Sequence, residues 1–260
     1  MNQTSSPPSP GVRPPELELC TICDRPYLPR LLAMAMSLRR VCPSLRLHVV
    51  CLDDATTGYL RERAGIVTIP LAELERVDSA VAATRSSRSR KTYAWTLKPA
   101  CCVHVLRTRS DAEAVAFVDA DLLFFSSPDP IFAELARASV LLVPERPEPP
   151  SAWTDAGVRP ELGTTRGATK GFYNSGLVAF RRDVDGLAAL HWWRQRCVES
   201  CEPGSVAGQH GDQWHLNEVP ALFAGVRVIE HPGVGLAPWN AHAAKLGLRR
   251  GQLLADGHPG

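Results

Sequence analysis

The sequence lacks both a long apolar run and an excess of charge of either sign. No stretch approaches the roughly 20 apolar residues of a membrane-spanning helix, and the opening segment MNQTSSPPSPGVRPPE lacks the apolar core of a signal peptide. The 29 basic and 27 acidic residues nearly cancel, so no global charge favours nucleic acid or a membrane surface as the main partner. We expect a cytoplasmic chain with no transmembrane segment and no nucleic-acid partner, and peripheral attachment to a membrane stays open.

The cysteines also lack the spacing of a complete metal site. Cys20 and Cys23 form a CxxC pair, but no second CxxC and no histidine pair with zinc spacing accompanies it. Without an export signal, we expect reduced thiols rather than disulfides. Cys20, Cys51, Cys101 and Cys102 stand in apolar segments, as buried thiols often do. A zinc or redox role for the CxxC pair is the less favoured alternative.

What the sequence does contain is an alternation of strand-like and helix-like segments. Strand patterns occur at 17–23, 45–54, 66–70, 114–118, 139–144, 175–183 and 226–230, and helix patterns at 27–40, 56–65, 92–106 and 186–201. This alternation predicts an α/β fold in one domain over residues 17–248, with a mainly parallel, Rossmann-like central sheet flanked by helices. Residues 1–16 are predicted to be a disordered lead-in and 249–260 a C-terminal tail.

Three segments qualify this outline. The helix pattern at 92–106 contains Pro99, where we expect the helix to break or to start. The run RSSRSRK (85–91) reads as a solvated loop, with phosphate binding as the alternative. Residues 145–170 are rich in proline, glycine and charge, which predicts a long excursion over the ligand edge of the sheet.

Asp-x-Asp occurs twice in the sequence. In AVAFVDADLLFFSSPDP (114–130), Asp119 and Asp121 follow an apolar strand of central type. Ligands of parallel sheets bind at the carboxyl ends of strands, and two carboxylates there can hold a hard divalent cation. Asp183 and Asp185 instead open a helix, where acidic residues cap amide groups. We therefore interpret the first pair as functional and the second as structural.

Several motifs in order resemble the GT-A-fold nucleotide-sugar glycosyltransferases, in particular the retaining branch that contains glycogenin and the bacterial lipopolysaccharide glucosyl- and galactosyltransferases. They are CTICDRPYLPRLLAMAMSLRR, FVDADLLFF, YNSGLVAF (173–180), GDQWHLN (211–217) and HPGVGLAPWN (231–240). Together they cover roughly residues 17 to 240, and their order is far more specific than any single motif.

The resemblance implies a set of binding residues. Near the base and ribose of the nucleotide it places Thr21, Asp24 and Tyr27. As ligands of Mn²⁺ or Mg²⁺ it gives Asp119, Asp121 and His231, since a neutral imidazole can join carboxylates around such a cation. As further substrate-binding residues it gives Lys98, Asn174, Ser175, Gly176 and Trp239.

The catalytic residues implied by the resemblance are Asp212 and Gln213. Asp212 would hydrogen-bond the donor sugar, and Gln213 would lie near the reacting carbon as a polar, weakly nucleophilic group. A helix N-cap is the alternative for Asp212. Trp192 and Trp193, on the 186–201 helix, are interpreted as packing residues rather than a sugar platform.

The sequence departs from the retaining family at one position. Where the family has Lys-Pro-Trp, this chain has Ala237-Pro238-Trp239, so a cation expected on the leaving phosphate is missing. We expect a substitute from Lys98, Arg166, Lys170 or the 85–91 run, or else weaker catalysis.

The function implied is a metal-dependent hexosyltransferase. It would use a nucleotide-diphospho-sugar, with uridine diphosphate as the expected carrier, and transfer the sugar with retention to a glycan, lipid or protein acceptor that the sequence leaves undefined. A nucleotidyltransferase is the first alternative, although CTICDRPYLP lacks the glycine-rich phosphate loop that such enzymes use. A sugar-nucleotide-binding protein without activity is the second, and Ala237 is the reason to consider it.

Overall fold

A seven-stranded sheet organises the chain, in the strand order β3-β2-β1-β4-β6-β5-β7. The computed structural model describes residues 15–145, 171–202, 211–238, 240–241, 244–249 and 252–259. The strands of the sheet are β1 (Leu17–Cys23), β2 (Leu47–Cys51), β3 (Ile66–Pro70), β4 (Ala114–Val118), β5 (Val140–Pro144), β6 (Tyr173–Arg181) and β7 (Val226–Val228). Only β6 runs antiparallel to its neighbours, β4 and β5, which confirms the predicted mainly parallel sheet.

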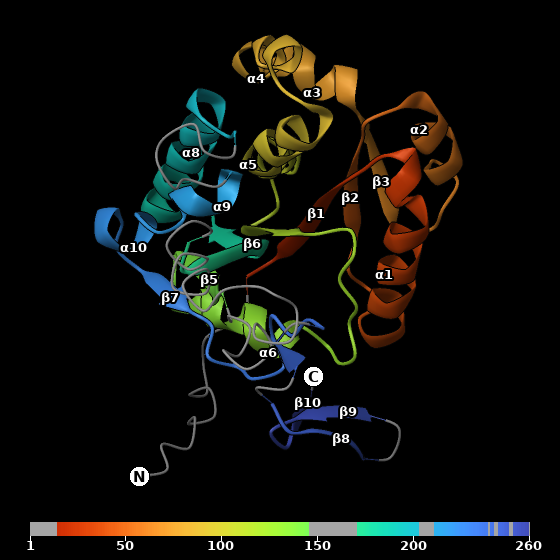
Figure 1. Cartoon of the computed structure of the whole chain (residues 1–260), viewed down its shortest axis with the longest axis vertical. Helices are drawn as coiled ribbons and strands as arrows, with labels where there is room; N and C mark the ends of the chain where they lie inside the picture. The colour runs from red at the N-terminus through yellow and green to blue at the C-terminus, as the bar shows by residue number, and fades with distance from the viewer. Residues whose placement is uncertain are drawn as a thin grey trace, which may run out of the picture.

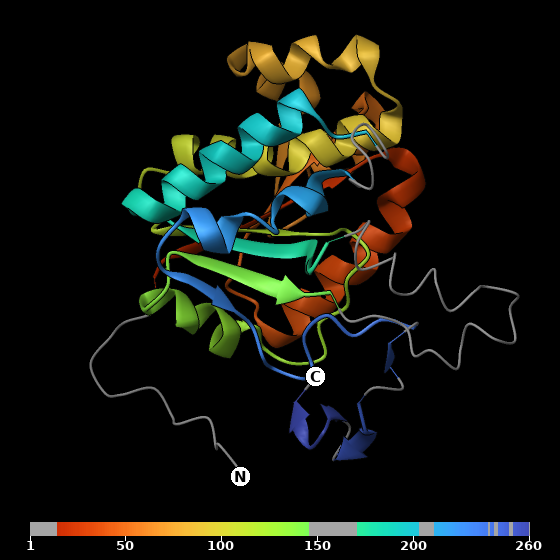
Figure 2. The same ribbon diagram turned by 60° about the vertical axis from the view of Figure 1, so that its left-hand side comes forward.

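Helices cover both faces of this sheet (Figures 1 and 2). The α-helices are α1 (Leu28–Val41), α2 (Asp54–Leu60), α3 (Leu71–Val77), α4 (Ser79–Ala83), α5 (Arg90–Thr108), α6 (Asp129–Phe132), α8 (Val184–Glu199), α9 (Gly211–His215) and α10 (Val219–Leu222). Short 3-10 helices are η1 (Arg25–Tyr27), η2 (Arg85–Ser87) and η3 (Ala133–Ala136). Residues of α3, α4, α5 and α8 pack on one face, and residues of α1, α2, α6 and η3 on the other.

The central strand β4 supplies both hydrophobic cores. Val115 and Phe117 point to the α5 and α8 side, whereas Ala114, Ala116 and Val118 point to the α1 side. All five are buried, as expected for a strand covered on both faces. The residues are apolar as long as the strand is covered by helices. Asp119 follows where the strand leaves the core and the chain turns at the carboxyl edge of the sheet.

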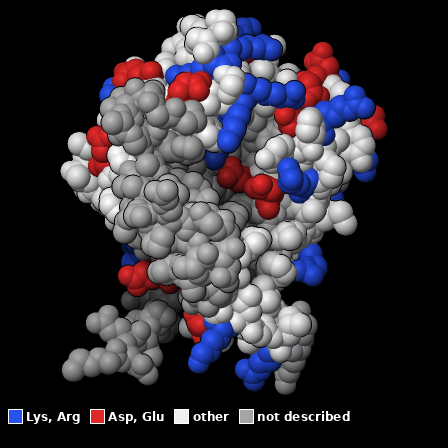
Figure 3. Space-filling view, viewed as in Figure 1, with Lys and Arg blue, Asp and Glu red and all other residues white. Residues whose placement is uncertain are grey.

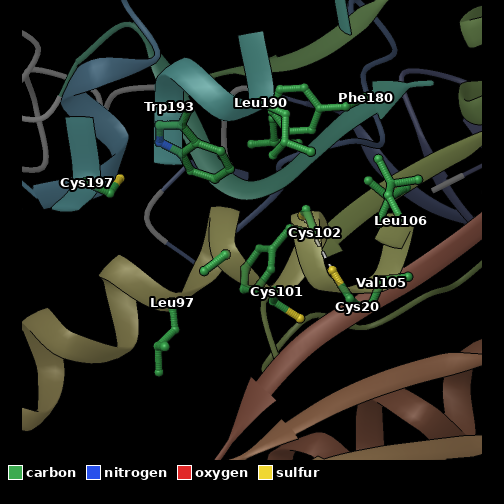
Figure 4. Packing of buried hydrophobic residues seen from close by; sticks show 14 of the residues in the cluster. Cys20, Leu97, Cys101, Cys102, Val105, Leu106, Phe180, Leu190, Trp193 and Cys197 are labelled. Atoms are coloured by element: carbon green, nitrogen blue, oxygen red, sulfur yellow. Dashed lines mark hydrogen bonds between the residues drawn. The ribbon is translucent and has the colours of Figure 1, made fainter. Parts of the chain in front are cut away.

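Figure 4 shows the core between α5, α8 and the sheet. The rings of Phe180 and Trp193 stack with centroids 5.8 Å apart, and Trp193 is fully buried. Trp192 makes an edge contact with Phe223, so both tryptophans pack as predicted. The Sγ atoms of Cys20 and Cys102 lie 3.5 Å apart in this core. All eight cysteines are free and buried.

The expected break at Pro99 is wrong, because α5 runs without interruption from Arg90 to Thr108. Its N-terminus is capped by the Ser89 hydroxyl, which accepts the Thr92 N–H at 3.2 Å. A proline inside a helix loses one backbone hydrogen bond. Pro99 nevertheless lies on the stretch of α5 that is buried against β1 and β4, so tertiary packing outweighs that local cost.

The basic run 85–91 is largely exposed to solvent, as predicted, but most of it is helical rather than a loop. It forms η2 and the first residues of α5, and its basic side chains have partners within the chain. Arg88 donates to the Cys197 carbonyl at 2.7 Å, which ties the end of α8 to the start of α5. Arg85 pairs with Glu75 at 3.1 Å, and the Lys91 ammonium lies 4.8 Å from the centre of the Trp95 ring.

The segment predicted as a tail, 249–260, contains β9 (Gln252–Ala255) and β10 (His258–Pro259) of a second sheet. Its third strand, β8 (Leu246–Arg249), begins within the predicted domain; the three strands pair antiparallel, below the main sheet in Figure 1. Residues 1–14 of the predicted lead-in and 146–170 of the predicted excursion lie outside the described residues. No helix in the part of the chain that the structure describes is long and apolar enough to cross a membrane.

Candidate active site

Polar and charged residues gather at one edge of the sheet, where the parallel strands end and β6 begins. Asp24, Asp53, Asp119 and Glu145 each lie within two residues of the carboxyl end of β1, β2, β4 or β5. Because β6 is antiparallel, its first residues, Tyr173 to Ser175, reach the same edge. Figure 3 shows acidic side chains in a hollow bordered by basic ones on the face in view. This is the edge at which ligands of such sheets bind.

Lys98 is the centre of this edge. It projects from α5 with only 9% of its side chain exposed, and its ammonium lies 3.0 Å from Asp119 Oδ1 and 3.3 Å from Asp212 Oδ2. It also donates to the Ser175 hydroxyl at 3.1 Å. Burial lowers the pKa of Lys98, but the two carboxylates outweigh that effect, so the net pKa is raised and the lysine stays charged. One buried cation thus joins β4, β6 and α9.

Asp119 has a different electrostatic balance. Burial raises its pKa, Lys98 opposes that shift, and the charges of Asp212 and Asp121 add to it, so the net pKa lies above the usual value. Its side chain is still 35% exposed, unlike that of Asp212, of which 4% is exposed. Asp119 therefore lies between the buried network and solvent.

The Asn-x-Gly sequence of β6 has a steric explanation. The Asn174 side-chain oxygen accepts the Gly176 N–H at 2.7 Å, and the Gly176 carbonyl accepts the Asp119 N–H at 2.8 Å. A Cβ atom at Gly176 would lie 2.7 Å from Asn174 Oδ1 and 3.0 Å from Asp119 Oδ2. Only glycine lets these two side chains approach the strand so closely.

Gln213 and Asn174 share one acceptor that the sequence analysis missed. The Gln213 side-chain nitrogen donates to Glu145 Oε2 at 3.2 Å, and that of Asn174 donates to the same oxygen at 2.8 Å. Glu145 follows β5 directly, at the edge where ligand-binding residues are expected. In the sequence, only its position directly after a predicted strand could have indicated Glu145. It was instead assigned to the predicted excursion that begins at residue 145.

Asp212 is not a helix N-cap, because it lies within α9 and pairs with Lys98. Its backbone carbonyl accepts the Trp193 indole N–H at 3.0 Å, so the core tryptophan also fixes the start of α9. By contrast, Asp183 is a cap, accepting the Gly186 N–H at 2.7 Å at the start of α8. The structural interpretation of the second Asp-x-Asp is thereby confirmed.

The predicted nucleotide-binding residues lie on and after β1. Thr21 is fully buried, and its hydroxyl has no hydrogen-bond partner in the described part of the chain. Asp24 accepts the Tyr27 N–H at 3.0 Å and pairs with Arg90 at 2.9 Å. Tyr27 is 42% exposed. Arg90 also reaches Asp53 at 3.6 Å, so it bridges the ends of β1 and β2. Trp239 lies outside the described residues.

The predicted metal ligands are only partly brought together. Asp121 is exposed in the turn after β4, close enough to Asp119 to raise its pKa. The His231 ring nitrogen Nδ1 accepts the Gly233 N–H at 3.1 Å. Over the described ranges, no group of three or more His, Cys, Asp or Glu side chains is arranged to hold a metal. Of the predicted ligands, Asp119 and Asp121 fit a hard cation, since carboxylate oxygens suit Mn²⁺ and Mg²⁺.

Comparison with solved structures identifies the type of fold. Apo mouse xyloside xylosyltransferase 1 matches with a TM-score of 0.52 at 16% identity, over 82% of this chain and 84% of that one. The fold is therefore of the GT-A type found in glycosyltransferases.

Sequence comparison then gives the family. The chain is 30% identical to the uncharacterized protein YfnF of Bacillus subtilis (strain 168) over 243 residues, which is 92% of this chain and 78% of YfnF. It is 32% identical over 243 residues to the uncharacterized protein YfnD of the same organism, covering 92% of this chain and 74% of YfnD. The chain belongs to the family of YfnF and YfnD. No protein-family model matches it.

Proposed function

We propose that the chain is a metal-dependent glycosyltransferase that moves a hexose from a nucleotide-diphospho-sugar, with UDP as the expected carrier, to an acceptor. The observation that carries this proposal is the network in which Lys98 joins Asp119 and Asp212 at the ligand edge of a GT-A-type sheet. Asp119 and Asp212 are 93 positions apart in the sequence, yet both pair with Lys98 in one polar site.

Each residue of the site has a task suited to its chemistry. Asn174 and Asp212 offer amide and carboxylate groups to sugar hydroxyls. Asp119 and Asp121 would hold Mn²⁺ or Mg²⁺, which stabilises negative charge developing on a departing diphosphate. Lys98 pairs with the Asp119 and Asp212 carboxylates and holds them in place.

Lys98 was one of the residues expected to replace the lysine that the resembled family has where this chain has Ala237. Its charge is matched by two carboxylates of the chain, so it is a weak candidate for the substitute cation on the leaving phosphate. Arg166 and Lys170 lie outside the described residues. In the basic run, Arg90 also pairs with two carboxylates, Asp24 and Asp53, but its side chain is 62% exposed, whereas that of Lys98 is 9% exposed, which makes Arg90 the better-placed candidate.

The test is a panel of UDP-, GDP- and ADP-hexoses incubated with the chain and Mn²⁺, with release of the nucleoside diphosphate as the readout. We expect slow hydrolysis of one donor, suppression by excess chelator, and recovery when Mn²⁺ is restored. Binding of a donor without turnover would instead identify a sugar-nucleotide-binding protein. Release of pyrophosphate from a nucleoside triphosphate and a sugar phosphate would identify a nucleotidyltransferase.

Retention of the anomeric configuration is the second expected result. Gln213, proposed to lie near the reacting carbon, has an amide that cannot take a proton from an attacking hydroxyl as a general base does. NMR of the anomeric proton in the first-formed product reads the configuration directly, because the signal is recorded before mutarotation. A product of inverted configuration contradicts retention and leaves the transferase assignment intact.

A further inference from the structure

Two side-chain amides at the site are held from the same side by one carboxylate. Asn174 Nδ2 and Gln213 Nε2 donate to Glu145 Oε2 at 2.8 and 3.2 Å. A carboxylate oxygen only accepts hydrogen bonds, so it selects the NH₂ end of each amide and rejects the carbonyl end. Glu145 thereby determines which way both amides face.

The opposite ends of the two amides are fixed by backbone donors. Asn174 Oδ1 accepts the Gly176 N–H at 2.7 Å, and Gln213 Oε1 accepts the Ser175 N–H at 3.3 Å. A backbone N–H only donates, so turning either amide over would place donor against donor and oxygen against carboxylate. Each amide therefore has a single satisfied orientation.

Glu145 itself is held by the sheet. Its N–H donates to the Phe172 carbonyl at 2.8 Å, and the preceding residues of β5, Val143 and Pro144, pair with Asn174 and Tyr173 of β6. The register between the two strands shifts between Leu142 and Val143, a bulge of the kind that redirects side chains near functional sites. The half-buried carboxylate is thus aimed at the amides by backbone contacts on both strands.

We propose that Glu145 is a positioning residue for the transfer reaction, which fixes the Asn174 and Gln213 amides in the orientation that faces the donor sugar. This inference rests on the proposed function. Because Oε2 accepts one hydrogen from each amide, the role assigned to Glu145 is to act through Asn174 and Gln213.

Comparison of Glu145→Gln with Glu145→Ala distinguishes a positioning role of Glu145 from direct participation in the reaction. Glutamine keeps a carbonyl oxygen that can accept both amide hydrogens but loses the negative charge. We expect donor turnover by Glu145→Gln within about threefold of the wild type, and a loss of at least about tenfold in kcat for Glu145→Ala. Glu145→Ala is also expected to weaken binding of the UDP-hexose more than binding of UDP, which lacks the sugar. Glu62→Ala, at an exposed glutamate before β3 on the opposite edge, is the matched control.

A readout without donor keeps this inference separate from the proposed function. In a chain labelled with ¹⁵N at asparagine and glutamine, Asn174→Asp and Gln213→Glu identify the two side-chain NH₂ signals. We expect both signals to be dispersed in the wild type and in Glu145→Gln, and to move to random-coil positions in Glu145→Ala. Unchanged signals in Glu145→Ala overturn the inference, as does a Glu145→Gln variant as inactive as Glu145→Ala. If no donor binds while the signals behave as expected, the proposed function fails and the positioning by Glu145 stands.

Discussion

Replacing Lys98 with methionine is expected to lower the free energy of unfolding at pH 7 by about 3–5 kcal/mol, the usual cost of leaving a buried charge without its partner. Methionine fills a similar volume, so packing changes contribute little. Most of the loss is attributed to Asp212, of which 4% is exposed, because Asp119 is 35% exposed and solvent screens its charge. Urea unfolding measures the difference.

The loss is expected to depend on pH. Burial already raises the pKa of Asp119 while Lys98 is present. Without the lysine, nothing opposes that shift, so Asp119 binds its proton more tightly in the folded than in the unfolded chain, and the free energy of unfolding falls as pH rises through its folded pKa. The difference in free energy of unfolding between the variant and the wild type is therefore larger at pH 7 than at pH 5. Lys91→Met, in the first turn of the same helix, is the control. An equal loss of unfolding free energy at pH 7 and pH 5 in the Lys98 variant would show that an unpaired buried carboxylate is not the cause.

Replacing Asp121 with alanine is expected to reduce donor turnover at least about 100-fold, because one of the two carboxylates proposed for the cation is lost, a change of about 2.7 kcal/mol or more in transition-state stabilisation. The side chain is exposed, so the fold is expected to lose no more than about 0.5 kcal/mol. Turnover with saturating UDP-hexose and Mn²⁺ measures the first effect, and thermal unfolding the second.

The second Asp-x-Asp provides a matched control for this experiment. Asp185 lies in the first turn of α8, behind the capping residue Asp183, and has no place in the candidate site. We expect Asp185→Ala to turn over donor at the wild-type rate. A variant with Asp121→Ala that keeps its turnover, with the same dependence on Mn²⁺ as the wild type, would remove Asp121 from the proposed metal site.

Local pattern predicted the sheet well because several of its strands, β2, β4 and β5, are buried on both faces. The run at 114–118 could only be a central strand, and that placed Asp119 at the ligand edge. Pro99 shows the limit of rules based on local sequence. The α5 helix continues through this proline because it is buried against two strands, and helix propensities contain no information about such tertiary contacts. Lys98 shows another limit, because lysine is rarely buried and its partners lie 21 and 114 positions away.

Glu145 shows why the site could be predicted only in part. Its partners, Asn174 and Gln213, are 29 and 68 positions away. They meet because β6 returns antiparallel between β4 and β5 and because the β5–β6 register shifts just before Glu145. Neither feature has a periodic signature in the sequence. The resemblance supplied Asn174 and Gln213 individually, and only the fold joins them through one carboxylate.

The place of β6 in the sheet has a consequence for synthesis on the ribosome. β4 and β5 are complete once residue 144 has emerged, but their shared partner ends at Arg181. Until then, two apolar strands present open rows of N–H and C=O groups, on which another nascent chain can pair. At roughly 5–20 residues per second this interval lasts several seconds. The yield of folded protein therefore depends on keeping neighbouring chains apart during that interval, as well as on the stability of the finished molecule.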